Sequence, residues 1–203
     1  MSLPDGYVHP TADVAPEAII SKGAKVWHYA QVRENSTLGK NSIVGRGAYI
    51  GTGVQVGDNC KIQNYALVYE PARLANGVFI GPAVVLTNDH FPRAINADGS
   101  QKSAADWKPV GVTIDEGASI GANSTCIAPV RIGKWALVGA GSVVVRDVPD
   151  YALVVGSPAK RIGWVGTAGH PLISGGDNIW ICPVTEQKYL EIDQDKLIET
   201  EDK

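Results

Sequence analysis

The stretch IVGRGAYIGTGVQVGDNCKIQNYALV, residues 43–68, carries Val or Ile at every sixth position. The same six-residue spacing runs without a break from Val8 to Leu86, and all fourteen positions are aliphatic. Val, Ile and Leu make up roughly a quarter of the chain, so chance would give this run with odds on the order of one in 10^8. Such a repeat is typical of a parallel β-helix. The aliphatic positions are Val8, Val14, Ile20, Val26, Val32, Leu38, Val44, Ile50, Val56, Ile62, Val68, Leu74, Ile80 and Leu86.

Two further positions of each hexad follow a rule. The fourth residue after nearly every aliphatic is small, as in Ala24, Ser42 and Ala66, so we expect two of six side chains to point inward. The third residue after the aliphatic is often Gly or Asn, which tolerate the positive φ of a tight turn. These turn residues are Gly23, Asn35, Asn41, Gly47, Gly53, Asn59 and Gly77. Three hexads then make one triangular coil of 18 residues, with coils stacked about 4.8 Å apart.

The period breaks once. The hexad that Leu86 opens would place His90 in the small position, and the pattern resumes only at Ile114, which is not a whole number of hexads later. We therefore predict an excursion loop at about residues 88–112, and a long loop in a regular domain is more often functional than idle. Counting leaves open on which side of the triangle the chain rejoins. A helical alternative fails, because six-residue spacing rotates around an α-helix instead of forming a stripe.

The composition narrows the classes of function. The 203 residues include 18 basic and 21 acidic side chains, so a nucleic-acid-binding protein is a poor expectation. We expect no membrane association, since no apolar run reaches membrane-spanning length and the polar start does not look like a signal peptide. Cys60 and Cys126 fall on inward positions and are expected to be buried, unpaired thiols, which favours the cytoplasm. The cysteine spacing offers no zinc motif.

The hexad pattern fades between residues 149 and 166. We expect one repeat domain over residues 1–166 and a tail over residues 167–203. The tail has a short apolar alternation at 179–184 and a charged end from Glu186 to Lys203. That end is expected to form a small extra element and a frayed terminus.

Several segments resemble the hexapeptide-repeat acyltransferases, whose fold is a left-handed parallel β-helix. They are IGTGVQ (50–55), VGDNCK (56–61), IGANST (120–125), IGKWAL (132–137), VGAGSV (138–143) and the closing VPDYALVVGSPAKRIG (148–163). The resemblance therefore implies an all-β fold: a left-handed parallel β-helix with one excursion loop and a short C-terminal tail. The left-handed sense rests on the resemblance alone, because general crossover rules favour the right hand.

Two segments narrow this resemblance, KIQNYALVYE (61–70) and GPAVVLTNDHFPRA (81–94). They are similar to sugar N-acetyltransferases that acetylate the 3-amino group of UDP- or dTDP-linked sugars, including the enzymes acting on UDP-2-acetamido-3-amino-2,3-dideoxyglucuronate. This resemblance implies acetyl-CoA as cosubstrate, a cytoplasmic homotrimer with sites between adjacent subunits, and a role in surface polysaccharide (lipopolysaccharide) synthesis. No metal is expected.

The 18-residue coil also predicts where chemistry gathers. Glu70 and Asn88 are 18 residues apart, as are Tyr69 and Thr87, so each pair should stack on one outer face beside the loop exit. We expect a single pocket near this patch. Its candidate catalytic residues are Asn88, which would position the amine, and His90, and its candidate substrate-binding residues are Asn64, Tyr69, Glu70, Asp89 and Arg93.

Each candidate has a bland alternative. A histidine titrates near neutral pH and suits a general base, but His90 could equally contact substrate or close the loop exit. Glu70 could merely hydrogen-bond Asn88 and orient it. The guanidinium of Arg93 matches a sugar carboxylate or a pyrophosphate, and it could also anchor the loop through a salt bridge.

The coenzyme side is expected on the later coils. Small residues there would let a pantetheine arm run along backbone amides, although the repeat itself also requires small residues. Lys160 and Arg161 resemble the family's contact to the nucleotide phosphates. The candidate coenzyme-binding residues are Gly121, Ala122, Gly139, Ala140, Lys160 and Arg161. The outward aromatics Trp27, Tyr29, Tyr49 and Trp135 are expected to pack subunits together.

Three other functions stay open. A γ-type carbonic anhydrase shares this fold but needs three histidines converging on zinc. His9 and His28 are 19 residues apart, so we expect them not to stack, and His90 and His170 lie far along the chain. An O-acetyltransferase would depend more strictly on a histidine base. A non-enzymatic interaction module would bind no coenzyme A.

Overall fold

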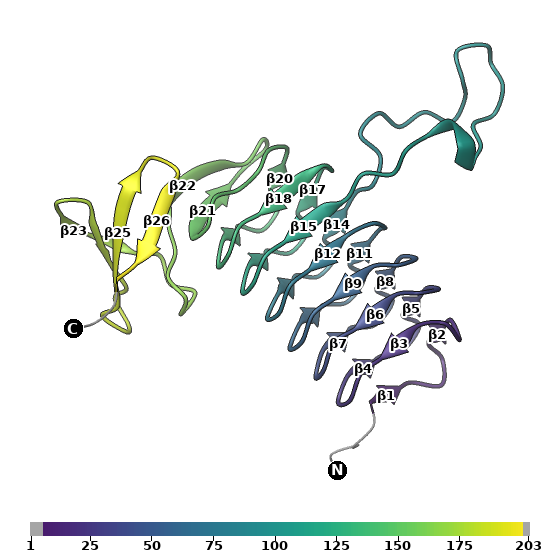
Figure 1. Ribbon diagram of the computed structural model, residues 1–203, viewed down its shortest axis with the longest axis horizontal. Coiled ribbons are helices and arrows are strands. Elements are labelled where there is room, and N and C mark those ends of the chain that lie inside the picture. The colour runs from purple at the N-terminus through teal and green to yellow at the C-terminus, as the bar shows by residue number, and fades with distance from the viewer. Residues whose placement is uncertain (1–5, 201–203) are drawn as a thin grey trace.

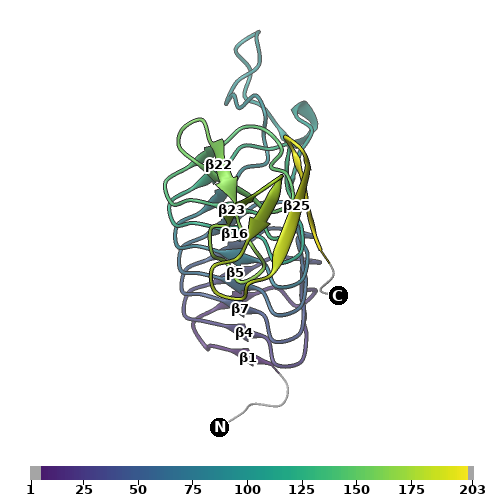
Figure 2. The ribbon, with the colours of Figure 1, turned by 90° about the vertical axis from the view of Figure 1, so that its left-hand side faces the viewer.

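The computed structural model describes residues 6–200 and shows an all-β protein, a three-sided parallel β-solenoid followed by a small antiparallel sheet (Figure 1). The predicted β-helix class is therefore confirmed, and the left-handed sense remains an implication of the resemblance. In a second view the coils stack as a column, with the C-terminal strands in front of it (Figure 2).

Each side of the solenoid is one sheet of short strands. Sheet A holds β1 (Tyr7–Val8), β4 (Lys25–Val26), β7 (Ile43–Val44), β10 (Lys61–Ile62), β13 (Phe79–Ile80), β16 (Ser119–Ile120), β19 (Leu137–Val138), β21 (Ala152–Val155) and β22 (Lys160–Trp164). Sheet B holds β2 (Asp13–Val14), β5 (Gln31–Val32), β8 (Tyr49–Ile50), β11 (Leu67–Val68), β14 (Val85–Leu86), β17 (Thr125–Cys126) and β20 (Val143–Val144). Sheet C holds β3 (Ile19–Ile20), β6 (Thr37–Leu38), β9 (Gln55–Val56), β12 (Arg73–Leu74), β15 (Val112–Ile114) and β18 (Val130–Ile132).

The coil length is the predicted one. Val8 pairs with Val26 in sheet A, Val14 with Val32 in sheet B and Ile20 with Leu38 in sheet C, each partner lying three hexads further along the chain. All of these pairings are parallel, so the backbone of each coil bonds to the coils on either side. Residues separated by three hexads therefore lie one above the other.

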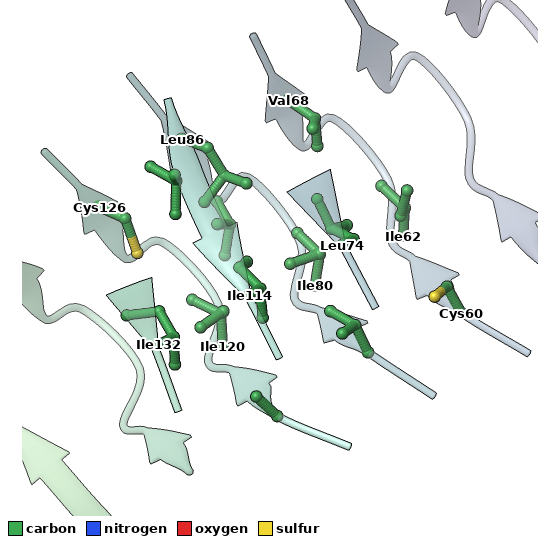
Figure 3. Close-up of a cluster of buried hydrophobic side chains, with 14 of the residues drawn as sticks. Cys60, Ile62, Val68, Leu74, Ile80, Leu86, Ile114, Ile120, Cys126 and Ile132 are labelled. Carbon is green, nitrogen blue, oxygen red and sulfur yellow. The ribbon is translucent and has the colours of Figure 1, made fainter. Parts of the chain in front are cut away.

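The interior is filled by the two expected positions of each hexad. Figure 3 shows the large aliphatics of the three sides stacking toward a common axis, with Ile62, Ile80 and Ile120 from sheet A facing Leu74, Ile114 and Ile132 from sheet C. Cys60 and Cys126 lie within this core, as predicted. Burial raises the pKa of both thiols, that of Cys126 to about 12, so both remain protonated and unreactive at neutral pH.

The corners adopt the predicted backbone conformation. All seven Gly and Asn turn residues named from the sequence have positive φ, between 57° and 76°. The pattern missed Tyr29, Tyr65 and Trp135, which take the same conformation although a Cβ disfavours it. Two of these rings cover the next corner, since a Cβ on Gly47 would meet the ring of Tyr65 and a Cβ on Gly117 would overlap the ring of Trp135.

The excursion loop spans residues 87–111, between β14 and β15, so each boundary lies one residue before the prediction. Val112 belongs to a strand and is fully buried. The chain rejoins on sheet C, where Leu74 of β12 pairs with Ile114 of β15, whereas an uninterrupted coil would have paired it with position 92. The loop thus lengthens one coil and leaves the order of the sides unchanged.

The two ends of the solenoid differ. Val8 is 42% exposed, and Val14 and Ile20 are half-buried, because no described coil lies below them. At the other end β22 folds back antiparallel on β21, and a fourth sheet follows. Its strands are β23 (Ile173–Gly176), β24 (Ile179–Ile181), β25 (Lys188–Asp193) and β26 (Lys196–Glu199).

The small extra element expected in the tail is present, and it takes in most of the charged end, which is ordered in strands as far as residue 199. Residues 188–199 form a hairpin in which Tyr189 and Leu197 are buried, while the charged side chains mostly face solvent. The hydroxyl of Tyr189 accepts a hydrogen bond from the backbone N–H of Thr167 and its ring packs on Tyr151. Residues 201–203 lie outside the described residues.

Within residues 6–200 the only helix is the three-residue turn η1 (Ala104–Asp106), and no helix there is long and apolar enough to cross a membrane.

The stacking of coils predicts a stability difference between two glycines. A Cβ on Gly39 would overlap the backbone of Gly57 in the coil above, whereas a Cβ on Gly163 meets nothing within 4 Å. We expect Gly39→Ala to lower the free energy of unfolding by about 2 kcal/mol or more and Gly163→Ala to change it by less than about 0.5 kcal/mol. Chemical denaturation followed by circular dichroism measures both, and equal midpoints would contradict the close stacking.

Candidate functional site

The excursion loop leaves and rejoins the solenoid at the corner between sheets B and C. Its two ends are pinned together by the backbone N–H of Val110, which donates to the carbonyl oxygen of Asn88 at 3.0 Å. A Cβ on Gly111 would lie 2.9 Å from the carbonyl oxygen of Pro71, so the returning strand runs tightly against the corner below. In Figure 1 the loop projects outward from the column as a teal arm. It therefore overhangs one edge of the solenoid.

His90 is held by the coil above the loop. Its Nδ1 lies 3.0 Å from the carbonyl oxygen of Ala128. Because a carbonyl oxygen only accepts, Nδ1 must carry the proton of the neutral ring, which leaves Nε2 as an acceptor. The backbone N–H of the buried Ala128 donates to Oγ1 of Thr87 at 2.9 Å. Both backbone polar groups of Ala128 are thus fixed by the loop entrance, and the imidazole is oriented through them.

Two adjoining cavities are formed almost entirely by loop residues. The first, of about 470 Å³, brings Asp89 and His90 together with Val110 and residues from both arms of the loop. The second, of about 430 Å³, shares Asp89 with the first and includes Arg93. The further lining residues of the first are Phe91, Lys102, Asp106, Trp107, Lys108 and Pro129. Those of the second are Ala94, Gln101, Lys102, Ser103, Ala104 and Trp107.

The carboxylates of these cavities are engaged by the loop itself. Oδ1 of Asp89 accepts from the backbone N–H of Phe91 at 2.9 Å. Oδ2 of Asp106 accepts from the backbone N–H and the hydroxyl of Ser103, both at 2.7 Å. These two hydrogen bonds hold the pKa of Asp106 below its ordinary value. Both side chains therefore shape the loop, and Arg93 donates only to the neighbouring carbonyl of Pro92.

The structure separates the other predicted substrate residues from these cavities within one chain. Tyr69 and Glu70 lie one coil below Thr87 and Asn88, as the register predicts, and Asn88 is half-buried at the loop root. No hydrogen bond joins Glu70 to Asn88 among the described residues. Instead Oε2 of Glu70 is buried over Gly51 of the coil below and accepts no hydrogen bond from any described residue.

Asn64 lies at a different corner, between sheets A and B. Its Oδ1 accepts from the backbone N–H of Arg46 at 2.9 Å, one coil below. The same contact recurs at Asp58, which accepts from the N–H of Lys40, and at Asn76, which accepts from the N–H of Asp58. In one chain Asn64 is therefore part of a repeating corner contact and does not line the loop cavities.

The candidate coenzyme residues occupy two places. Gly121 and Gly139 are required by stacking, because a Cβ on Gly121 would overlap the backbone of Ala140 and one on Gly139 would lie 2.7 Å from Cγ1 of Val155. Ala122 and Ala140 flank them at the same corner, and Ala140 is exposed. The stacking of coils by itself therefore explains the small residues at this corner. They also project little from the corner.

Lys160 and Arg161 begin β22, at the C-terminal end of the solenoid that the fourth sheet follows (the capped end). Lys160 is exposed, and both residues line a cavity of about 360 Å³ that also includes Arg146. Arg161 is already engaged by the tail. Its guanidinium donates to the carbonyl oxygen of Gln194, lies 3.7 Å from Oε1 of Glu191 and stacks 4.1 Å from the ring centroid of Trp164. Of the predicted pair, Lys160 is the side chain that faces solvent.

One expectation about the histidines is wrong. His9 and His28 do stack, with ring centroids 3.5 Å apart, although their spacing differs by one position from a whole coil. Both residues lie at the corner between sheets A and B, in neighbouring coils. Their side chains point toward each other there, so the rings meet although the two residues are not vertical neighbours in the coil register. In the described part of the chain no three His, Cys, Asp or Glu side chains gather into a set that could hold a metal ion.

The outward aromatics divide into two groups. Trp27 and Tyr29 are exposed, at 37% and 58%, whereas Tyr49 and Trp135 are half-buried. Tyr49 packs against Tyr69 with ring centroids 5.2 Å apart, and burial together with the nearby Glu70 carboxylate raises the pKa of its phenol. A subunit interface on these residues stays a prediction.

Sequence reasoning missed most of the loop residues that line the cavities, among them Phe91, Lys102, Trp107 and Lys108. It also missed the roles of Thr87 and Ala128 in holding His90. The composition of the loop held a signal, because two aromatics, Phe91 and Trp107, and two lysines, Lys102 and Lys108, stand out in it beside the predicted polar residues.

Comparisons with known proteins agree with this architecture. Residues 34–64 and 111–146 match the family described as the hexapeptide repeat of succinyl-transferase. A solved hexapeptide-repeat acetyltransferase from Vibrio cholerae, in complex with acetyl coenzyme A, is 25% identical with a TM-score of 0.51 and covers 64% of this chain and 70% of its own.

Two curated relatives show what kinds of activity this repeat accompanies. The dTDP-3-amino-3,6-dideoxy-alpha-D-galactopyranose 3-N-acetyltransferase of Aneurinibacillus thermoaerophilus is 60% identical over 52 residues, 26% of this chain and 27% of the relative. The serine acetyltransferase of Escherichia coli K12 is 34% identical over 90 residues, 44% of this chain and 32% of the relative. In both cases the chain spans less than a third of the length of the relative that it matches.

The hydrogen bond between Nδ1 of His90 and the carbonyl oxygen of Ala128 predicts an unusual tautomer of the imidazole. Because Ala128 accepts from Nδ1, the neutral ring should be protonated at Nδ1, while free histidine prefers Nε2. Long-range ¹H–¹⁵N correlation spectra of the protein above pH 8 are expected to show a pyrrole-like Nδ1 and a pyridine-like Nε2 for this residue. His170 is exposed in the tail and serves as the reference. An Nε2–H signal from His90 would disprove the arrangement.

Proposed function

We propose that this hexapeptide-repeat chain is an acetyl-CoA-dependent acyltransferase that acetylates the 3-amino group of a nucleotide-linked sugar. The observation that carries the proposal is the acceptor nitrogen of His90, oriented by a backbone carbonyl at the wall of a loop cavity. The Aneurinibacillus relative, named as a 3-N-acetyltransferase of a dTDP-linked amino sugar, supports the choice of acceptor. The Vibrio cholerae structure supports acetyl-CoA as the acyl donor.

The chemistry needs an amine, an acetyl thioester and a proton acceptor. The neutral sugar amine attacks the thioester carbonyl carbon, so a C–N bond forms and the C–S bond breaks. The proton lost by the nitrogen passes to Nε2 of His90 and then to the departing thiolate, which leaves as coenzyme A thiol. The products are the N-acetyl sugar nucleotide and coenzyme A, and no oxidant, reductant or metal is consumed.

The chain's own residues orient these groups. His90 holds the proton-accepting position, and Asn88 at the loop root would position the amine. Lys160, with Arg146 beside the same cavity, would hold the phosphates of the coenzyme. Orientation of this kind contributes several kcal/mol to lowering the barrier in enzymes generally.

The proposed assembly is a cytoplasmic homotrimer with sites between subunits, serving surface polysaccharide synthesis. An interface would bring a neighbour's residues toward the loop, and this would account for Asn64, Tyr69 and Glu70 lying away from the cavities in one chain. The exposed Trp27 and Tyr29 are the apolar surface that such an interface would cover.

The main alternative is O-acetylation of a hydroxyl, favoured by the similarity to serine acetyltransferase. The two activities differ in their need for a base. A sugar amine is partly neutral near pH 7 and already nucleophilic, whereas a hydroxyl must lose its proton as it attacks. A histidine with a single acceptor nitrogen suits both reactions, so the choice of acceptor substrate and the effect of removing His90 distinguish them.

The test is incubation of the purified protein with acetyl-CoA and a panel of UDP- and dTDP-linked 3-amino sugars, their 3-hydroxy counterparts and serine. We expect free thiol to be released only with the amines, and mass spectrometry to show an acetyl group on nitrogen. Thiol release with the hydroxyl acceptors alone would reverse the assignment.

A companion variant measures the contribution of the base. We expect His90→Ala to lower kcat with an amino sugar by about a hundredfold, at the low end of general-base contributions, and to leave measurable turnover. His170→Ala is the matched control and should keep wild-type kcat. Complete loss of activity in His90→Ala, with unchanged circular dichroism, would favour a hydroxyl acceptor.

A further inference from the structure

Resting on the proposed function, we propose that the two loop cavities bind the nucleoside diphosphate part of the sugar nucleotide. Phe91 and Trp107 would pack against the base, and Lys102 and Lys108 would neutralise the diphosphate. The sugar would then extend toward Nε2 of His90. This assigns to the loop the recognition of the nucleotide, separately from the acetyl transfer itself.

The aromatic surface is the first support. Phe91 is 76% exposed, the largest value among the exposed large hydrophobic residues of the described chain, and its ring meets that of His90 edge-on with centroids 4.2 Å apart. Trp107 is half-buried and lines both cavities. An exposed aromatic beside a cavity has no role in the solenoid core. Aromatic side chains that flank a groove are the usual platform for a nucleic-acid base.

The charges are the second support. Lys102 lines both cavities and Lys108 lines the first. Neither forms an ion pair with any residue in the described range, although Lys102 lies close enough to Asp106 to help lower its pKa. The nearby carboxylates are already satisfied by backbone N–H groups and a hydroxyl. Two ammonium groups therefore remain available for an anion, and Arg93 adds a third cation at the second cavity.

The combination fits a nucleoside diphosphate better than a simple anion. A base needs an apolar face and a diphosphate needs at least two cations, and the cavities offer both within one continuous lining. His90 lies in the first cavity with them, so a sugar attached to the terminal phosphate would be directed at its acceptor nitrogen.

A second molecule in the proposed reaction carries the same chemistry, because coenzyme A also contains an adenosine diphosphate. Basic residues at the capped end of the solenoid offer the coenzyme a place of its own, and this leaves the loop to the sugar nucleotide. Arg146 and Lys160 line a separate cavity there, formed by coils beyond the loop. Two phosphate-bearing substrates thus have two distinct sets of cations.

Direct binding tests the proposal without any acetyl transfer. Isothermal titration calorimetry of the full chain with dTDP, UDP and adenosine 3′,5′-bisphosphate should show binding of dTDP or UDP. The double variant Lys102→Ala/Lys108→Ala should weaken that affinity by about tenfold or more. Phe91→Ala should weaken the affinity for dTDP or UDP by about fivefold or more, and Phe91→Tyr, which retains an aromatic ring, should keep the wild-type affinity. The matched control is Lys40→Ala/Lys134→Ala, two exposed lysines away from the cavities, which should bind as the wild type does.

The steady-state kinetics then separate this proposal from the proposed function. We expect the lysine variant to raise KM for the amino-sugar nucleotide by about tenfold with kcat nearly kept, while His90→Ala lowers kcat. Unchanged KM in the lysine variant would overturn the nucleotide site and leave the acetyltransferase standing. Loss of dTDP or UDP affinity in the lysine variant, with no turnover of any amine by the wild type, would support the site and overturn the activity.

Two other results would also overturn the site. One is wild-type protein that binds neither dTDP nor UDP at millimolar concentration. The other is a lysine variant that loses affinity for adenosine 3′,5′-bisphosphate and keeps affinity for dTDP and UDP, which would assign the loop to the coenzyme. Circular dichroism of each variant confirms that the solenoid is intact.

Discussion

The parallel backbone ladder between coils is the constraint on which the rest of the structure depends. After every three hexads the chain must return to the same place, so each hexad needs one strand, one corner and two inward side chains. Residues at the corners are squeezed between the coils above and below. This explains why Gly39 and Gly121 cannot carry a Cβ, and why the side-chain oxygen of Asn64 bonds the backbone of the neighbouring coil.

The repeating coils form flat, uniform faces, and a binding site needs a break in this repeat. The structure provides one at the corner between sheets B and C, where the loop leaves. The backbone of Ala128 is bonded on one side by Thr87 and on the other by His90, so the coil above the loop fixes the imidazole. The rigid solenoid thus supplies the orientation and the loop supplies the walls.

The periodic features were predictable because one local rule repeats. The aliphatic stack, the positive φ at residues such as Asn41 and Gly47, the burial of Cys126 and the pairing of β11 with β14 all follow from counting by six. The features that escaped prediction depend on side-chain direction or on contacts between non-repeating segments. His9 and His28 meet across a corner despite their spacing, and Arg161 is engaged by a hairpin that counting by six does not reveal. Similarly, Lys102 and Trp107 line the cavities through the fold of the loop, which no period describes.

The way the loop is inserted has a consequence for how such proteins diversify. Its ends are pinned by one backbone hydrogen bond, and the strand that follows rejoins sheet C in the register that an uninterrupted coil would have had. The number of residues in the arm is therefore decoupled from the six-residue period, and the entropic cost of lengthening a flexible segment grows only slowly. Exchange of this arm would therefore change the walls of the loop cavities and leave the ladder of the solenoid in register.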